Sequence, residues 1–246
     1  EDAASNIKFN FGISSNYFME IAKFRAVKHL WAKILEANGL ENFDTARTNI
    51  HAITGTWDMT LYDPYVNMLR STTKAMSAST GGVTSMTVLP FNIIYEDATT
   101  FSSRIARNQQ IILQEEAYFD KVADPAAGSY YVENLTDSII EHTWNLFLDI
   151  QERGGFIHAL KKGVIQKELK ETARKKQERI ASRRDTLLGT NQFPNFTEYH
   201  EFDSYLSETV KTVKDKEIEP IQTSRGANKL EKLRIETDVY SNHNSR

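Results

Sequence analysis

The sequence predicts an α/β protein, because strand-like and helix-like stretches alternate along it. Residues 7–12, 49–54 and 83–90 have the residue patterns of strands. Helical patterns of ten or more residues separate them, which is typical of parallel β/α units. With a fourth strand predicted at 186–193, the spacing suits an open α/β sheet or half of an eight-stranded β/α barrel, a fold that takes about 250 residues.

Each helix is predicted from an apolar stripe or from capping residues. Residues 16–39 place their apolar side chains on one broad helical face, and Gly39 stands where a helix would end. Asp63 is placed as an N-cap with Pro64 at the first helical position, so a second helix should begin there and end before a pair of glycines.

The second half of the chain is predicted to be mostly helical. A helix is expected over about residues 100–119, followed by a loop of small residues at 123–135. Thr136 is then expected to cap a further helix. A short helical turn and a long basic helix, about 165–183, lead to the fourth predicted strand.

The composition changes after Pro194, and we place a boundary there. Residues 1–194 are predicted to hold the β/α units, and residues 195–246 a polar helical extension and tail. A weak helical pattern appears at 227–238, and the last residues, 240–246, are expected to be disordered.

Composition excludes several classes of protein. The chain has 246 residues, 40% hydrophobic and 26% charged, with a formal net charge of −3, which gives no indication of nucleic-acid binding. It contains no cysteine, so disulfides, thiolate nucleophiles and cysteine metal sites are excluded. No apolar run is long enough for a membrane span. We expect a cytoplasmic protein.

Motifs of catalysis are absent from the sequence. It has no Gly-x-Gly-x-x-Gly, Walker A loop, Gly-x-Ser-x-Gly elbow or His-Glu-x-x-His. The six histidines are never three to five residues apart, which disfavours a local metal site. His51 stands out because it lies in a predicted strand, where a satisfied core or rim histidine is the favoured interpretation.

Other candidates each have a structural interpretation beside the functional one. Asp124 and Glu133 flank the small-residue loop and are expected to brace it rather than to act as acid and base. Tyr130 and Tyr131 could stack on a ligand, although packing is favoured.

Basic residues recur on two predicted helices. Arg104 and Arg107 could bind phosphate or could form a solvated face paired with Glu115, Glu116 or a neighbouring helix. Residues 167–184 carry acidic and basic side chains three to four positions apart, which favours an exposed helix with side-chain ion pairs.

Five stretches carry a family resemblance: "FMEIAKFRAVKHLWA", "DPYVNMLRSTTKAMSA", "FSSRIARNQQIILQEE", "DPAAGSYYVENLT" and "ERGGFIHAL". The sequence resembles the cobalamin-dependent acyl-CoA mutases, specifically the methylmalonyl-CoA mutase family, from about residue 7 to 193. The resemblance implies the second half of a (β/α)8 TIM-type barrel that encloses an acyl-CoA beneath a corrin ring, plus a C-terminal helical extension. The matching region starts mid-barrel, so we expect a C-terminal portion of a longer subunit.

The first departure from the family falls at residues 81–89. Catalytic members read close to Gly-His-Thr-Gln-Ser-Leu-His-Thr-Asn there. This chain has Gly82 and Thr87 at the two histidine positions, and Thr84 at the glutamine position. Groups that could bind substrate or corrin are therefore missing.

A second departure falls at residues 49–57. Catalytic members read close to Arg-Thr-His-Ser-Gln-Thr-Ser-Gly-Trp. His51 and Trp57 match that run, while Asn49 and Ile53 replace its arginine and glutamine. A pocket that controls radicals needs preorganised polar groups, so these losses imply a chain with no catalytic, cofactor or metal residues of its own.

The resemblance therefore implies the small, non-catalytic subunit of a heterodimeric methylmalonyl-CoA mutase, an isomerase. The family's Asp-x-His-x-x-Gly cobalamin motif is absent, so adenosylcobalamin is expected in a catalytic partner subunit. The alternative is a fragment of a divergent, catalytically competent mutase. A half-barrel would leave sheet edges open, so the isolated chain is also expected to self-associate or to be partly unfolded.

Overall fold

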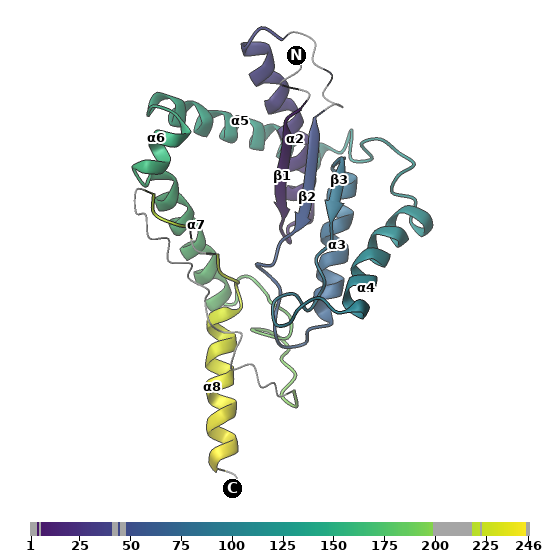
Figure 1. Ribbon diagram of the computed structural model, residues 1–246, viewed down its shortest axis with the longest axis vertical. Coiled ribbons are helices and arrows are strands. Elements are labelled where there is room, and N and C mark those ends of the chain that lie inside the picture. Colours follow the sequence, from purple (N-terminus) through teal and green to yellow (C-terminus); the bar gives the residue numbers. More distant parts are fainter. Residues whose placement is uncertain are drawn as a thin grey trace. The chain divides into compact units, whose positions relative to one another are not determined.

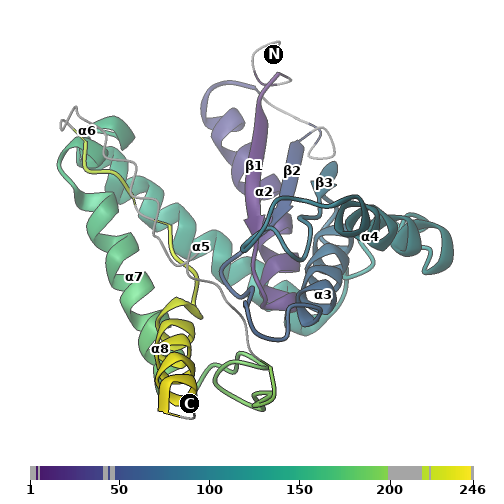
Figure 2. The ribbon, with the colours of Figure 1, turned by 60° about the horizontal axis from the view of Figure 1, so that its bottom comes forward.

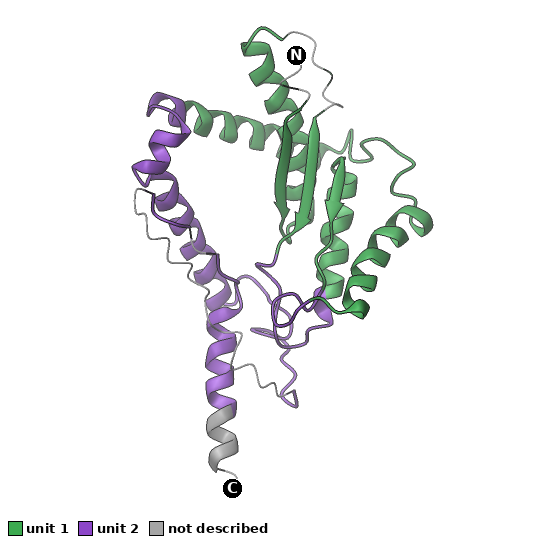
Figure 3. Ribbon diagram, viewed as in Figure 1, with its two compact units in different colours: residues 1–55, 68–90, 98–148 green, residues 56–67, 91–97, 149–246 purple. Residues whose placement is uncertain are grey.

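The chain divides into two compact units that interleave along the sequence (Figure 3). Unit 1 comprises residues 1–55, 68–90 and 98–148, and unit 2 comprises residues 56–67, 91–97 and 149–246. The computed structural model describes residues 4, 6–40, 44, 48–198, 218–221 and 223–244, with side chains as far as residue 238. The sequence boundary after residue 194 stays a prediction.

Unit 1 contains a parallel three-stranded sheet in the order β1-β2-β3 (Figure 1). The strands are β1 (Lys8–Ile13), β2 (Asn49–Thr54) and β3 (Ser85–Thr87). The first two strands confirm the sequence prediction. The third is shorter than predicted, because the Leu89 N–H donates to the Thr54 hydroxyl at 2.9 Å instead of extending the strand ladder.

Four α-helices accompany the sheet in the described sequence: α2 (Tyr17–Ala37), α3 (Val66–Thr80), α4 (Thr100–Ile111) and α5 (Tyr130–Glu152). The Asn16 side chain caps α2, and Thr99 with Ser102 forms a capping box at the start of α4. A π-helix, η2 (Ile112–Glu116), continues α4, so the helix predicted at about 100–119 is present with a π-helical end.

The core of unit 1 lies between one face of the sheet and the helices α2 and α3 (Figures 1 and 2). Phe24 of α2 and Ala78 of α3 pack against Ile13, Ile50 and Ala52, and each of these side chains is at most 1% exposed. Alternate residues of the strands carry this core because successive side chains point to opposite faces. The other face of the sheet is left for polar residues.

Unit 2 is largely helical, with α6 (Phe156–Lys161), α7 (Val164–Ala181) and α8 (Asn228–Asn244). Ile180 of α7 packs with Leu187 and Ala227, and Trp57 and Leu230 lie against this cluster. The predicted basic helix is confirmed as α7. Its ion pairs join Arg174 to Glu171 and Glu178, and Lys175 to Glu171.

The strand predicted at 186–193 is wrong. Residues 186–193 form a tight turn with one isolated bridge between Leu188 and Gln192. The Asn191 side chain accepts from the Leu187 N–H at 2.7 Å, and Gly189 adopts a φ of 79°. The side chain of Asn191 thus satisfies backbone that a strand partner would otherwise engage, and the described residues hold three strands rather than four.

The predicted start of α3 at Asp63 and Pro64 is also wrong, since the helix begins at Val66. Asp63 has a φ of 52°, and its N–H donates to the Glu198 carboxylate at 2.9 Å. That contact holds Asp63 in a turn before the helix, so it cannot act as the predicted N-cap.

Thr136 does not cap α5, which begins six residues earlier at Tyr130. The Thr136 hydroxyl donates to the Val132 carbonyl within the helix at 2.8 Å. Glu133 accepts instead from the Gly128 N–H at 2.9 Å, just before the helix starts. A side chain inside the first turn therefore orders the entry to α5.

The predicted disorder of residues 240–246 is wrong as far as Asn244, because α8 continues to that residue. Ser245 and Arg246 lie outside the described residues. Among the described helices, none is long and apolar enough to cross a lipid bilayer. The cytoplasmic location stays a prediction.

Candidate functional site: the open face of the sheet

The candidate site is the face of the sheet opposite the core of unit 1, which we call the open face. Strand register places Asn10 beside His51 and His51 beside Ser85. The alternation of side chains brings eight residues to this face: Lys8, Asn10, Gly12, Asn49, His51, Ile53, Ser85 and Thr87.

The open face is polar and accessible. Lys8, Asn10, Ser85 and Thr87 are exposed, and His51 is half-buried. Parallel sheets normally have both faces covered and read as continuous apolar runs. A parallel sheet with one polar face is therefore suited to lining a wet interior rather than a second apolar core.

His51 is fixed between two hydroxyl groups of β3. Its Nδ1 lies 2.8 Å from the Ser85 Oγ, and its Nε2 lies 3.1 Å from the Thr87 Oγ1. A neutral imidazole donates from one nitrogen and accepts at the other, and a hydroxyl can serve either role. The cluster therefore satisfies both ring nitrogens, which fixes the ring between β2 and β3 and confirms the favoured interpretation of a satisfied histidine.

Charged residues brace the carboxyl end of β1, where β/α proteins place their chemistry. The Lys23 ammonium donates to the Gly12 carbonyl at 2.7 Å and to Glu20. Glu20 also accepts from the Ser14 hydroxyl at 2.6 Å. The carboxylate and the ammonium of this group engage one another and the strand end, so their arrangement is structural.

A second lysine holds the carboxyl end of β2. Lys74 of α3 is 1% exposed, and its ammonium donates to the Gly55 carbonyl at 2.7 Å. A Cβ at Gly55 would lie 2.9 Å from the Ile13 carbonyl oxygen, so the backbones of β1 and β2 come close just beyond their ends. The hydrogen bond from Lys74 thus holds the end of β2, and the close approach of the two backbones there leaves no room for a side chain at residue 55.

Some of the residues singled out from the family resemblance meet on the open face and others do not. Asn49, Ile53 and Thr87 lie there with His51. Thr84 instead accepts from the Ile50 N–H at 3.1 Å.

Gly82 and Trp57 lie elsewhere. Gly82 stands in the turn between α3 and β3, and Trp57 packs beside Ile180 and Ala227 in unit 2. Ser85 was missed by sequence reasoning, although its two-residue spacing from Thr87 places both on one face.

Asp124 and Glu133 have a structural role, as predicted: Glu133 accepts from Gly128 in the loop, and both carboxylates also tie α2 to this region. Both form ion pairs with Arg25, at 3.2 Å for Asp124 and 2.8 Å for Glu133. The hydrogen bond from Arg25 lowers the pKa of the Glu133 carboxyl, and the same bond raises the pKa of the Arg25 guanidinium. A carboxylate held ionised in this way is suited to bracing rather than to proton transfer.

Arg25 should contribute measurably to stability, because its guanidinium also donates to Thr136 at 3.2 Å and is 11% exposed. We expect Arg25→Ala to lower the free energy of unfolding by about 2 kcal/mol, since several charged hydrogen bonds are lost together. The control is Arg153→Ala, which removes an exposed pair with Asp149 within one helical segment and should cost at most about 0.5 kcal/mol. Urea unfolding followed by circular dichroism measures both, and equal losses would contradict the bracing role.

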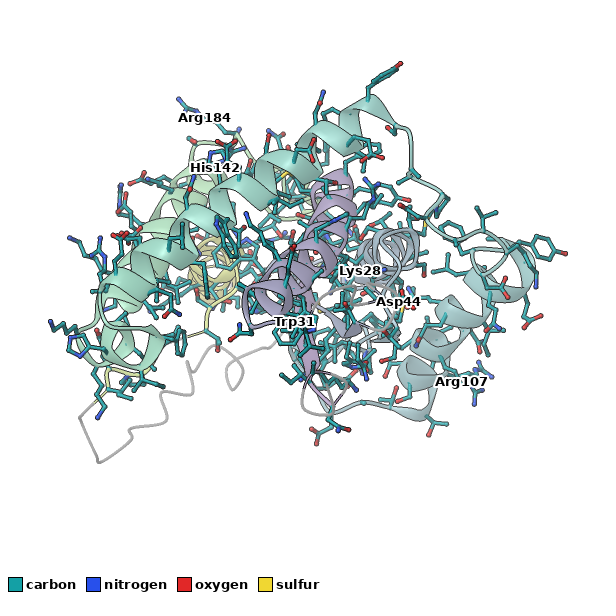
Figure 4. All side chains as sticks on the ribbon, turned by 90° about the horizontal axis from the view of Figure 1, so that it is seen from above. Lys28, Trp31, Asp44, Arg107, His142 and Arg184 are labelled. Carbon is teal, nitrogen blue, oxygen red and sulfur yellow. The ribbon has the colours of Figure 1, made fainter. Side chains whose placement is uncertain are left out.

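The packing predicted for the two tyrosines is present in part, and the two arginines lie on the surface. Tyr131 packs edge-on against Phe18 with ring centroids 5.5 Å apart, but Tyr130 is 89% exposed. Packing is therefore right for Tyr131 and wrong for Tyr130. Arg104 lies over the Phe101 ring at 5.8 Å, and Arg107 is exposed (Figure 4).

Metal binding finds no support on the described surface. Among the described residues, no group of three or more histidine, aspartate or glutamate side chains is placed to hold a metal ion. The polar groups of the open face are hydroxyls, amides, one imidazole and one lysine ammonium, all of which can form hydrogen bonds.

Comparison with known proteins decides the family. The family model of methylmalonyl-CoA mutase matches residues 1–238. The chain belongs to the methylmalonyl-CoA mutase family. It is 50% identical over 240 residues to the methylmalonyl-CoA mutase small subunit of Porphyromonas gingivalis, which covers 97% of this chain and 39% of that protein.

Other members of the family are less similar. Identity is 38% over 190 residues to the methylmalonyl-CoA mutase large subunit of P. gingivalis, covering 77% of this chain and 27% of that protein. It is 36% over 223 residues to the mitochondrial methylmalonyl-CoA mutase of Bos taurus, covering 90% of this chain and 30% of that protein. The chain thus spans less than half the length of each of these relatives.

Proposed function

We propose that this chain is part of the small, non-catalytic subunit of a heterodimeric methylmalonyl-CoA mutase. Its role would be to support a catalytic subunit that interconverts methylmalonyl-CoA and succinyl-CoA, an isomerase reaction. The observation that carries the proposal is the higher identity, over nearly the whole chain, to the small subunit of P. gingivalis than to the large subunit of the same organism.

The fold supports a place in a β/α barrel. Three parallel strands carry an apolar core on the face that meets α2 and α3, and polar residues on the other. In a closed barrel the helices surround the sheet, and the inner face is lined by alternate strand residues. We infer that the described strands belong to the second half of such a barrel, with the open face turned inward.

The chemistry of the open face supports a non-catalytic role. Both ring nitrogens of His51 are occupied by the hydroxyls of Ser85 and Thr87, so this histidine is not available as an axial ligand for cobalt. Since the imidazole of the open face is already engaged, we place adenosylcobalamin in the catalytic partner.

The partner would be a separately encoded catalytic chain. In P. gingivalis, proteins named small subunit and large subunit both resemble this chain, which indicates that the family includes paired chains. We therefore propose a heterodimer.

An alternative is a portion of a divergent mutase that is itself competent. One observation favours it: His51, which matches a histidine of the catalytic members, lies on the open face where a substrate could reach it. In that case the groups missing at Gly82 and Ile53 would have to come from another segment or chain.

Titration with adenosylcobalamin separates the two proposals. We expect no saturable change in corrin absorbance with the purified chain at micromolar concentration, because the open face provides no free imidazole and its family-specific polar groups are replaced at Ile53 and Thr87. Addition of a catalytic mutase subunit is the positive control and should restore saturable binding. Saturable binding by the chain alone would overturn the non-catalytic assignment and support the alternative.

A further inference from the structure

Lys28 of α2 is placed unusually, with its ammonium nitrogen directly over Gly82. A Cβ built at Gly82 would lie 2.7 Å from the Lys28 Nζ, and no other heavy atom of the described residues lies within 4 Å, chain neighbours aside. Gly82 is exposed and has a φ of 69°. Because residue 82 has no side chain, the Lys28 amine lies in the space that a Cβ would occupy. We call this space the niche, and it is open to solvent because Gly82 is exposed.

The amine in this niche has no hydrogen-bond acceptor among the described residues. Two other lysines of unit 1 each have one: Lys23 donates to Gly12 and Lys74 to Gly55. Half-buried lysine amines normally find such a partner, since an unmet donor costs about 1–3 kcal/mol. Figure 4 labels Lys28 on α2, and Arg25 stands three residues earlier in the same helix.

Neighbouring charges and burial both act on this amine. Burial lowers the pKa of Lys28, the negative charge of Asp124 opposes that change, and the positive charge of Arg25 adds to it. Arg25 is held in place by Asp124 and Glu133, so its cation remains close. A partly desolvated lysine beside another cation is an environment that activates lysine as a nucleophile.

We propose that Lys28 is a site of covalent acylation, at which its amine reacts with an acyl-CoA thioester. The free amine attacks the thioester carbonyl and forms a C–N bond, and the C–S bond breaks to release coenzyme A as its thiolate. The amine loses one proton, which the leaving thiolate or water takes up, so an amide and a free thiol result. No oxidant or metal is needed.

The reactivity of the amine follows from the niche, while the choice of a thioester as its reagent rests on the proposed function, in which the partner subunit converts an acyl-CoA. Two reagents separate these parts. Acetic anhydride at limiting concentration reports the reactivity of each amine, and succinyl-CoA tests the thioester itself.

The experiment labels the full chain at pH 7 and measures acylation of each lysine by peptide mass spectrometry. Lys162 and Lys167 are exposed and serve as reference amines. We expect Lys28 to react at least about threefold faster than either reference with both reagents, since a lower pKa enlarges the free-amine fraction.

Two glycine variants test the niche. Gly82→Ala places a methyl group against the Lys28 amine and should bring its labelling rate to that of the references. Gly163→Ala is the matched control, because Gly163 has a similar φ of 75° but no heavy atom within 4 Å of its Cβ position. This variant should leave Lys28 labelling unchanged, and circular dichroism checks that both variants fold.

Each other outcome overturns a stated part of the proposal. Labelling of Lys28 no faster than the references with either reagent would refute the reactive amine. Fast labelling by the anhydride with none by succinyl-CoA would refute the thioester. Equal effects of the two glycine variants would refute the role of the niche.

Discussion

Replacing Glu231 with alanine should lower the free energy of unfolding of unit 2 by about 3–5 kcal/mol, because it leaves the partly buried Arg225 cation without its carboxylate partner. The Glu231 side chain is 0% exposed and pairs with Arg225 at 2.7 Å. Its other oxygen accepts from the Leu61 N–H at 2.7 Å. Arg225 also donates to the Met59 carbonyl at 3.0 Å, so one ion pair ties the segment before α8 and the helix itself to residues 59–61.

Two further variants separate charge from shape at this position. Glu231→Gln can still accept from Leu61 and should lose only about 2 kcal/mol, since the remaining hydrogen bond is no longer to a charged group. Arg179→Ala removes an exposed pair with Asp185 and should lose at most about 1 kcal/mol.

Urea unfolding gives the stabilities, and hydrogen exchange locates the loss. Exchange should speed up in residues 57–62 and 225–238 if the pair joins them. If the free energy of unfolding of Glu231→Ala lay within about 1 kcal/mol of that of the parent chain, the pair with Arg225 would not stabilise unit 2 as proposed.

A catalytic mutase subunit should become more stable when this chain binds it. A protein that binds only the folded state of its partner adds RT ln(1 + [L]/Kd), about 2.7 kcal/mol at a hundredfold excess over Kd. The reciprocal gain should appear in this chain, because linkage is symmetric for binding free energies. Melting curves of each chain alone and of the mixture measure both shifts.

The sequence predicts that the region from Arg225 to Arg234 takes part in this contact, through Leu230 and Leu233. Leu230 packs inside unit 2, whereas Leu233 is 60% exposed. Deletion of residues 220–246 would therefore remove the buried Glu231 and Ile235 and is expected to disrupt unit 2 itself. The sequence-based expectation is that this deletion weakens association without unfolding the β/α units, and it stays a prediction.

A single substitution is the better test of this contact. Leu233→Asp should reduce the partner's stabilisation, and Leu169→Asp, at an exposed leucine of α7, should leave it unchanged. If both variants stabilised the partner equally, we would conclude that Leu233 of α8 does not lie in the interface. No stabilisation by the parent chain would contradict the support-subunit proposal.

Secondary structure was predicted correctly from the sequence where residues close to one another in the chain determine it. β2 occupies the predicted residues 49–54, and α2 starts after Asn16 and ends near Gly39, as capping and amphipathic spacing predict. The ion pairs of α7 also followed from three- and four-residue spacing. Predictions failed where distant side chains satisfy the backbone, as Glu198 does at Asp63.

The sequence by itself determined the family, the parallel β/α character and the presence of His51 in a strand. Only the tertiary structure decided what His51 touches, because its bonds to Ser85 and Thr87 depend on the register of β2 with β3. The same holds for Glu231, which bonds to a backbone 170 residues away, and for Lys28, whose amine lies over Gly82. Periodicity and capping describe contacts within a few residues, whereas these arrangements arise when separate elements pack, and no local pattern encodes them.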